Sequence, residues 1–274
     1  MDLNRLRRLA AEVDREHREA MRTIHDDLVR EVVEVDAAAA ASRRSFLRRL
    51  GLGGTALTVG STTLVVAANR AGAQTTTTAG GATTSGGATT STGATTSGVA
   101  TTTTTSPPRQ PTTEDIPLLV FAQSLELAAV TAYTTATGTG KLGEDAMSIA
   151  SSFQDHHLQH AQAFGGLAGK ASLNVANESL VAAFDPRISR APDEDAVLQV
   201  LFELETAAAS TYVAGLGTIR GINASTTMAN IMPIESRHAV VWGEALELDL
   251  DEYVPTFEDP DKAATPTEYP ILER

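Results

Sequence analysis

The sequence predicts an all-α fold, a four-helix bundle made of two similar helix pairs. The first observation is a repeat: the segment Glu126–Tyr133 (ELAAVTAY) recurs as Glu205–Tyr212 (ETAAASTY). The second is that His157–Ala161 (HLQHA) is echoed, at nearly the same offset, by Glu235–Ala239 (ESRHA). The third is composition: aromatic residues make up only 4% of the chain, and its abundant alanines suit closely packed helices. Together these features indicate an internal duplication of one helical hairpin.

Residues 1–41 predict a charged helix. Leucines and valines recur there at helical spacing, with acidic and basic residues interleaved. We interpret this segment as a solvated or partly disordered leader, and we assign no metal role to His17 or His25.

The next segment, residues 42–73, contains three features in order. The pair Arg43-Arg44 is followed by Phe46-Leu47, then by a weakly apolar run at 50–68, then by Ala71-Gly72-Ala73. This order resembles a twin-arginine export signal with a signal-peptidase site, and the alternative is a cytoplasmic basic helix beside an apolar one. The resemblance implies recognition by the twin-arginine export machinery and an extracytoplasmic location, secreted or in the cell envelope. If cleavage does not occur, the apolar run is the segment expected to contact the membrane.

Two segments on either side of the bundle are not expected to contribute to its core. Residues 74–113 are almost entirely Thr, Ser, Gly and Ala, with prolines near the end, and such a composition predicts a disordered linker. Residues 251–274 form an acidic tail that contains several prolines and is expected to lie over the surface.

The predicted bundle occupies residues 114–250. Its helices are expected at 115–137, 144–168, 193–216 and 225–248. Asp115 is the expected N-cap of the first helix, and Pro233 falls inside the fourth, which should kink there or begin late.

The connections between these helices predict the topology. The first and third connections are short and make antiparallel pairs, whereas residues 169–191 form a long connection with little periodicity. That connection is long enough to run the length of a helix. The expected arrangement is therefore up-down-down-up with one long crossover.

Six potential metal ligands fall on the predicted core faces of this bundle. They are Glu126 on the first helix, His157 and His160 on the second, Glu205 on the third, and Glu235 and His238 on the fourth. An isolated buried carboxylate is costly, so it is normally paired, protonated or bound to a metal. No lysine lies on these faces to neutralise the acids.

This arrangement resembles the ferritin-like superfamily of di-metal carboxylate proteins, whose pattern is one Glu from each of two helices and Glu-x-x-His from each of the other two. The resemblance covers residues 115–248. It implies metal ligands at Glu126, His160, Glu205, Glu235 and His238, with Tyr133 and Tyr212 beside the Glu ligands. It also implies one or two bound metal ions, iron first with Mn or Zn as alternatives, and oxidation of Fe(II) by oxygen or peroxide.

The sequence departs from this pattern at His157, which occupies the position expected for a Glu. Three carboxylates cannot neutralise two divalent ions, and an imidazole cannot bridge two ions as a carboxylate does. The site should therefore favour Zn, Fe(II), Mn or Cu over a ferric pair. A single-metal site also remains open.

Composition excludes several other classes of function. The chain lacks cysteine, which rules out disulfides, Fe–S clusters and thiolate metal sites. Its net charge is −13 and the acidic excess follows residue 73, so nucleic acid and anionic lipid are not expected partners. A homo-oligomer is compatible with the sequence. The alternative to a metalloprotein is a non-catalytic structural or interaction domain of the cell envelope, in which a decayed metal site forms a hydrogen-bonded network.

Overall fold

The computed structural model describes residues 2–49, 106–249 and 260–271. The apolar run at 50–68, the cleavage site at 71–73 and most of the linker lie outside these ranges, and the side chains of Arg43 and Arg44 are not described. The helices are α1 (Leu3–Arg49), α2 (Ile116–Gly138), α3 (Glu144–Ala168), α4 (Glu178–Arg190), α5 (Glu194–Leu216) and α6 (Ile222–Ala245), with short 3₁₀ turns η1 (Gly169–Ala171) and η2 (Pro260–Lys262). The described ranges contain no strand, and the predicted all-α fold is confirmed.

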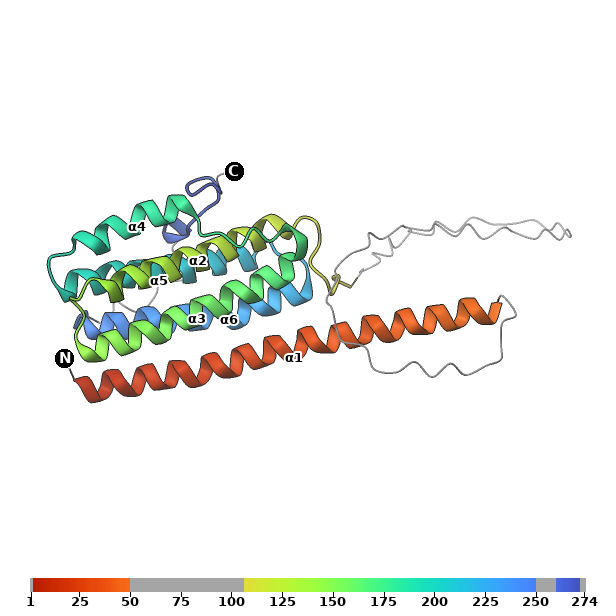
Figure 1. Ribbon diagram of the computed structural model, residues 1–274, viewed down its shortest axis with the longest axis horizontal. Helices are drawn as coiled ribbons and strands as arrows, with labels where there is room; N and C mark the ends of the chain where they lie inside the picture. Colours follow the sequence, from red (N-terminus) through yellow and green to blue (C-terminus); the bar gives the residue numbers. More distant parts are fainter. Residues whose placement is uncertain (1, 50–105, 250–259, 272–274) are drawn as a thin grey trace, which may run out of the picture. The chain divides into compact units, whose positions relative to one another are not determined.

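Helices α2, α3, α5 and α6 form the four-helix bundle (Figure 1). Within it, α2 packs mainly on α3 and α5 mainly on α6, so that the two sequence repeats are two helical hairpins. Among the described helices, α2 alone is long and apolar enough to cross a membrane. However, 67% of its most apolar window is buried inside the bundle, as expected for a core helix.

The long crossover contains a helix that the sequence analysis did not predict. Asn177 begins α4 by accepting a hydrogen bond from the backbone N–H of Leu180 at 3.0 Å. Leu180, Phe184 and Ile188 then form a buried stripe one turn apart. The sequence analysis found little periodicity in this connection, in which Pro186 suggests a break, whereas tertiary packing of the stripe on α2 and α5 stabilises the helix around the proline.

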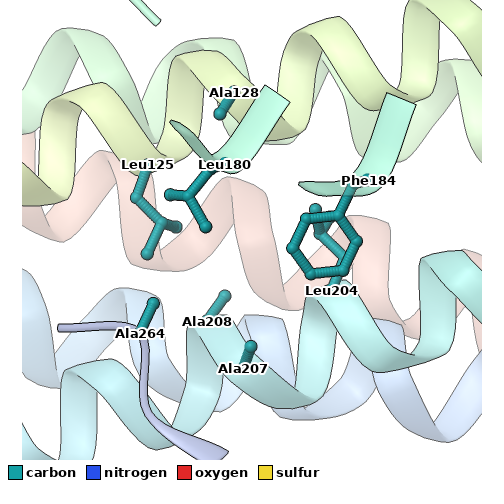
Figure 2. A pocket seen from close by; sticks show the side chains of 8 residues that line it. All are labelled: Leu125, Ala128, Leu180, Phe184, Leu204, Ala207, Ala208 and Ala264. Atoms are coloured by element: carbon teal, nitrogen blue, oxygen red, sulfur yellow. The ribbon is translucent and has the colours of Figure 1, made fainter. Parts of the chain in front are cut away.

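Helix α4 and the C-terminal segment cover the face of the bundle formed by α2 and α5. Ala264 N–H donates to Thr211 Oγ1 at 2.8 Å, and Asn177 Nδ2 donates to the Tyr269 carbonyl at 3.0 Å. Between them lies a cavity of about 10 Å³ whose lining is mainly apolar (Figure 2). The side chains that line it are Leu125, Ala128, Leu180, Phe184, Leu204, Ala207, Ala208 and Ala264. A cavity of this size and polarity is a packing defect, not a ligand site.

Helix α1 covers the other face of the bundle, formed by α3 and α6 (Figure 1). Leu6, Val13, His17 and Ile24 are buried there, each at most 3% exposed. Three ion pairs flank this stripe: Arg5 to Glu244 at 3.0 Å, Arg7 to Asp145 at 2.8 Å, and Glu16 to Arg237 at 2.5 Å. The interpretation of this helix as a solvated leader was therefore wrong for its first half.

Two predictions about helix ends can be compared with the structure. Asp115 is the N-cap residue of α2, as predicted, but its side chain makes no capping hydrogen bond and instead accepts from the backbone N–H groups of Thr112, Arg220 and Gly221 at 2.7 to 2.9 Å. It thereby ties the α5–α6 loop to the start of α2. Helix α6 begins at Ile222 and runs through Pro233, so it does not begin late.

Candidate metal centre

The structure brings all six predicted side chains together in the middle of the bundle. Each is completely buried, with 0% of its surface exposed. They are Glu126 on α2, His157 and His160 on α3, Glu205 on α5, and Glu235 and His238 on α6. They meet because each lies on the core-facing side of its helix.

Two tyrosines join the two halves of the repeat reciprocally. The hydroxyl of Tyr133 donates to Glu205, and the hydroxyl of Tyr212 donates to Glu126. Each tyrosine therefore supports the carboxylate of the other helical hairpin. The pair is not symmetric, because Trp242 Nε1 donates to the Tyr133 hydroxyl at 2.7 Å, whereas Tyr212 packs against the ring of Phe164.

His157 lies between the carboxylates of the two halves. Its Nδ1 is 2.7 Å from Glu126 Oε2, and its Nε2 is 3.0 Å from Glu205 Oε1. Burial alone would lower the pKa of His157, but the surrounding carboxylates, Glu205 first, raise it well above its ordinary value. His157 is therefore an imidazolium cation that neutralises part of the buried negative charge.

Glu235 and His160 are in a different state. Both carboxylate oxygens of Glu235 and both ring nitrogens of His160 are buried without a hydrogen bond. His160 Nδ1 and Glu235 Oε1 are 2.6 Å apart, close enough for an ion pair but not aligned as donor and acceptor. Buried polar atoms are rarely left unpaired, so these four atoms point to a missing common partner, such as a cation.

The donor atoms fall into two sets, each compact enough for one metal ion. One set is Glu126, His157, His160 and Glu235, and the other is His157, Glu205, Glu235 and His238. Within each set the ligand atoms lie within 4.8 Å of one another, close to the spread of ligands around an ion bonded at roughly 2.0 to 2.3 Å. Glu235 and His157 belong to both sets.

The electrostatics of the centre couple protons to the carboxylates. For His160, burial would lower the pKa, but Glu235 and Glu126 outweigh it and raise the pKa to about 9. For Glu126, burial would raise the pKa, but His160 and His157 lower it to about 2. The pKa of Glu205 is also well below its ordinary value, because His157 and His238 outweigh its burial. Imidazolium protons therefore supply the compensating charge in the metal-free protein.

These pKa shifts predict how the stability of the metal-free protein depends on pH. The contribution of Glu126 is present above pH 4.5 and lost as the pH falls toward about 2. The contribution of His160 is present below pH 6.5 and lost as the pH rises toward about 9. Urea unfolding in EDTA should show highest stability between these limits, with losses on the order of a few kcal/mol on each side. The variant His160→Gln should reduce the loss on the alkaline side, to which His157 also contributes, and a wild-type stability that rises between pH 6.5 and 9 contradicts this assignment.

Three further residues lie next to the centre, in addition to the six predicted ligands: Asp14, His17 and His156. His156, only 4% exposed, forms hydrogen bonds with His238 and Asp14. His17, 1% exposed, stacks on His156 with ring centroids 3.7 Å apart. The available signal was the spacing of Leu6, Val13, His17 and Ile24, which places His17 in the apolar stripe of α1.

Comparison with known proteins gives one match. The sequence model of the family described as "Ferritin-like domain" matches residues 114–248. No curated protein and no solved structure matches the chain. The matched range begins just before α2 and ends just after α6, so it covers the whole bundle and all six buried Glu and His side chains.

Proposed function

Residues 114–248 belong to the ferritin-like family, and on this premise we propose that the bundle binds two divalent metal ions in its Glu/His centre. The observation that carries the proposal is the group of buried atoms on Glu235 and His160 that make no hydrogen bond. One ion is held by Glu126, His160 and Glu235, and the other by Glu205, Glu235 and His238. Glu235 is the shared ligand because it alone among the three glutamates belongs to both donor sets.

His157 has a different part in this proposal. Both of its nitrogens are held by carboxylates, and a neutral imidazole offers only one lone pair. It therefore acts as a ligand to at most one ion, and only after losing a proton. Metal uptake should accordingly release protons and strengthen as the pH rises.

The substrate we propose is Fe(II). Two Fe(II) ions at these ligands supply two electrons, which reduce one oxygen molecule to hydrogen peroxide with the uptake of two protons. The chain contributes a buried site with three carboxylates and two imidazoles that hold the Fe(II) substrate. It supplies one carboxylate fewer than the family pattern, so we expect Fe(III) to be retained poorly and released.

The test is metal content and thermal stability of the full chain. After reconstitution with Fe(II), Mn(II) or Zn(II) and removal of free metal, elemental analysis should find up to two ions per chain. The same ions should raise the melting temperature, because a ligand that binds only the folded state stabilises it. Negligible metal content together with a melting temperature that ignores every ion refutes the proposal.

A second candidate function is a metal-free structural or interaction domain. The continuous hydrogen-bonded network through Tyr212, Glu126, His157, Glu205 and Tyr133 favours it, because this part of the centre is satisfied without a metal. It does not explain why the buried polar atoms of Glu235 and His160 make no hydrogen bond. The metal-content experiment separates the two functions.

We also propose that the twin-arginine pathway exports the protein. The support is the order of sequence features in residues 42–73. Replacing Arg43 and Arg44 together by Lys should keep the protein in the cytoplasm, because the pathway reads the arginine pair and not its charge alone. Fractionation with immunoblotting measures this, and unchanged export of the double variant contradicts the assignment.

A further inference from the structure

A chain of three side chains connects α1 to the metal centre. Asp14 Oδ1 lies 3.0 Å from His156 Nε2, and His156 Nδ1 lies 3.0 Å from His238 Nε2. The opposite nitrogen of His238, Nδ1, faces Glu205 Oε2 at 3.2 Å and Glu235 Oε2 at 3.4 Å. His238 therefore presents one nitrogen to the metal-binding carboxylates and the other to a partner anchored by α1.

The acceptor character of Asp14 decides where the protons of this chain lie. A carboxylate oxygen only accepts hydrogen bonds, so His156 must carry its hydrogen on Nε2. A neutral His156 then has its lone pair on Nδ1 and accepts the Nε2–H of His238. With a proton held on Nε2, His238 keeps Nδ1 as the nitrogen that a metal can bind, once the proton that Nδ1 shares with the carboxylates is displaced.

We propose that Asp14 is a positioning residue for the metal centre, which acts through His156 to hold His238 in the tautomer whose Nδ1 is free to bind a metal. The proposal rests on the proposed function and goes beyond it by making α1 part of the centre. Metal-binding histidines commonly donate their second N–H to an acceptor that fixes the ring, and loss of that acceptor weakens binding about 10- to 100-fold. Here the direct acceptor is His156 Nδ1 on α3, and Asp14, on a helix outside the ferritin-like domain, fixes which nitrogen of His156 accepts.

Packing around the chain fixes its geometry. His17 stacks on His156, and Phe153 stacks on His238 with ring centroids 3.9 Å apart. Ser152 Oγ donates to the same Asp14 oxygen at 2.5 Å, and Arg18 pairs with the other oxygen at 3.4 Å. The two imidazoles are thus restrained on their faces as well as at their nitrogens.

The duplicated half of the protein lacks such a chain. In the register that aligns His160 with His238, His156 corresponds to Ile234, which can make no hydrogen bond. Consistent with this, His160 Nε2 has no partner, although it is buried. The two histidine ligands are therefore inequivalent, and only His238 has its tautomer set from α1.

Removing the acceptor should invert the chain. Without Asp14, His156 is free to place its proton on Nδ1 and donate to His238 Nε2. His238 then carries its proton on Nδ1, where Glu205 accepts it. In that state a proton occupies the nitrogen that a metal needs.

The test compares the full-length wild type with Asp14→Ala, Asp14→Asn and Glu16→Ala. The first readout is the ¹⁵N chemical shift of His238 Nε2 in metal-free protein near neutral pH, which distinguishes a protonated from an unprotonated ring nitrogen. The second is the dissociation constant for Zn(II). Asp14→Ala should move the ¹⁵N shift of His238 Nε2 toward the value of an unprotonated ring nitrogen, and it should weaken Zn(II) binding about 10-fold or more. Asp14→Asn keeps an acceptor oxygen and should restore most of both properties.

Glu16→Ala is the matched control. It removes another α1 carboxylate that docks this helix on α6, through Arg237, but does not contact His156. It should leave the ¹⁵N shift unchanged and the Zn(II) affinity within about 2-fold of wild type. A wild-type ¹⁵N shift in Asp14→Ala, or equal losses of affinity in Asp14→Ala and Glu16→Ala, overturns the proposal. If the wild type binds no Zn(II), the proposed function fails, and the ¹⁵N shift still decides whether Asp14 sets the tautomer.

Discussion

Replacing His157 by glutamate is expected to make the stability of the bundle depend on metal. The substitution removes the imidazolium that lies between Glu126 and Glu205 and adds a fourth buried carboxylate. In EDTA the variant should lose about 3 to 5 kcal/mol of stability, the usual cost of breaking a buried ion pair. For a domain of this size the loss corresponds to a melting temperature lower by roughly 10 °C.

Divalent metal should reverse this loss. Four carboxylates match the charge of two divalent ions, and the restored Glu-x-x-His pattern on α3 then equals that on α6. Mn(II) or Fe(II) should therefore raise the melting temperature of His157→Glu by more than that of wild type, and any Fe(II) oxidation should become faster. Gln159→Glu, on the exposed side of the same helix, is the control and should show neither effect. A His157→Glu protein that is destabilised but not rescued by metal supports the metal-free network instead.

The second large effect is expected at Glu235, the carboxylate shared by the two donor sets. Glu235→Gln should lower the affinity for both ions, and for the more tightly bound ion by about 10-fold or more. The amide lacks the negative charge and has one acceptor oxygen in place of two. His238→Ala removes a ligand from one set only, so one ion should remain. Isothermal titration with Mn(II) and Zn(II) measures affinity and stoichiometry together.

Glu203→Gln is the control for this pair of variants. Glu203 lies on α5, two residues before Glu205 in the sequence. Its side chain is at the surface, where Oε2 lies 2.6 Å from Nη2 of Arg187. It should bind metal as the wild type does. If Glu235→Gln retains two ions at wild-type affinity, Glu235 is not the shared ligand, and the two-ion arrangement is wrong.

Much of the centre could be predicted from the sequence because its residues recur in register. A carboxylate or imidazole on an apolar helix face must point into the core, and the repeat places such groups on four helices at one level. The bundle and the meeting of all six side chains follow from that pattern. The hydrogen bonding of each group does not follow from the pattern. Both nitrogens of His157 contact carboxylates, whereas Glu235 makes no hydrogen bond, and this difference depends on tertiary packing and not on periodicity.

The contribution of α1 could not be predicted for a physical reason. Its buried stripe contains only a few apolar residues among many charges, and such a helix is equally consistent with a solvated segment. Helix α1 is positioned by ion pairs with helices far away in the sequence, Arg7 with Asp145 and Glu16 with Arg237. The pairing of each tyrosine with the glutamate of the other helical hairpin is likewise set by tertiary packing, because the seven-residue spacing of Glu and Tyr predicts only that both lie on one face of their own helix.

The most direct test of the account is the position of bound metal in crystals of the full chain. Anomalous diffraction from crystals grown with Zn(II) or Mn(II) locates the ions independently of any activity. We expect two peaks inside the bundle, one within bonding distance of Glu126, His160 and Glu235, the other of Glu205, Glu235 and His238 Nδ1. Peaks at the surface alone, with Glu235 and His160 still unliganded inside the bundle, contradict the central claim.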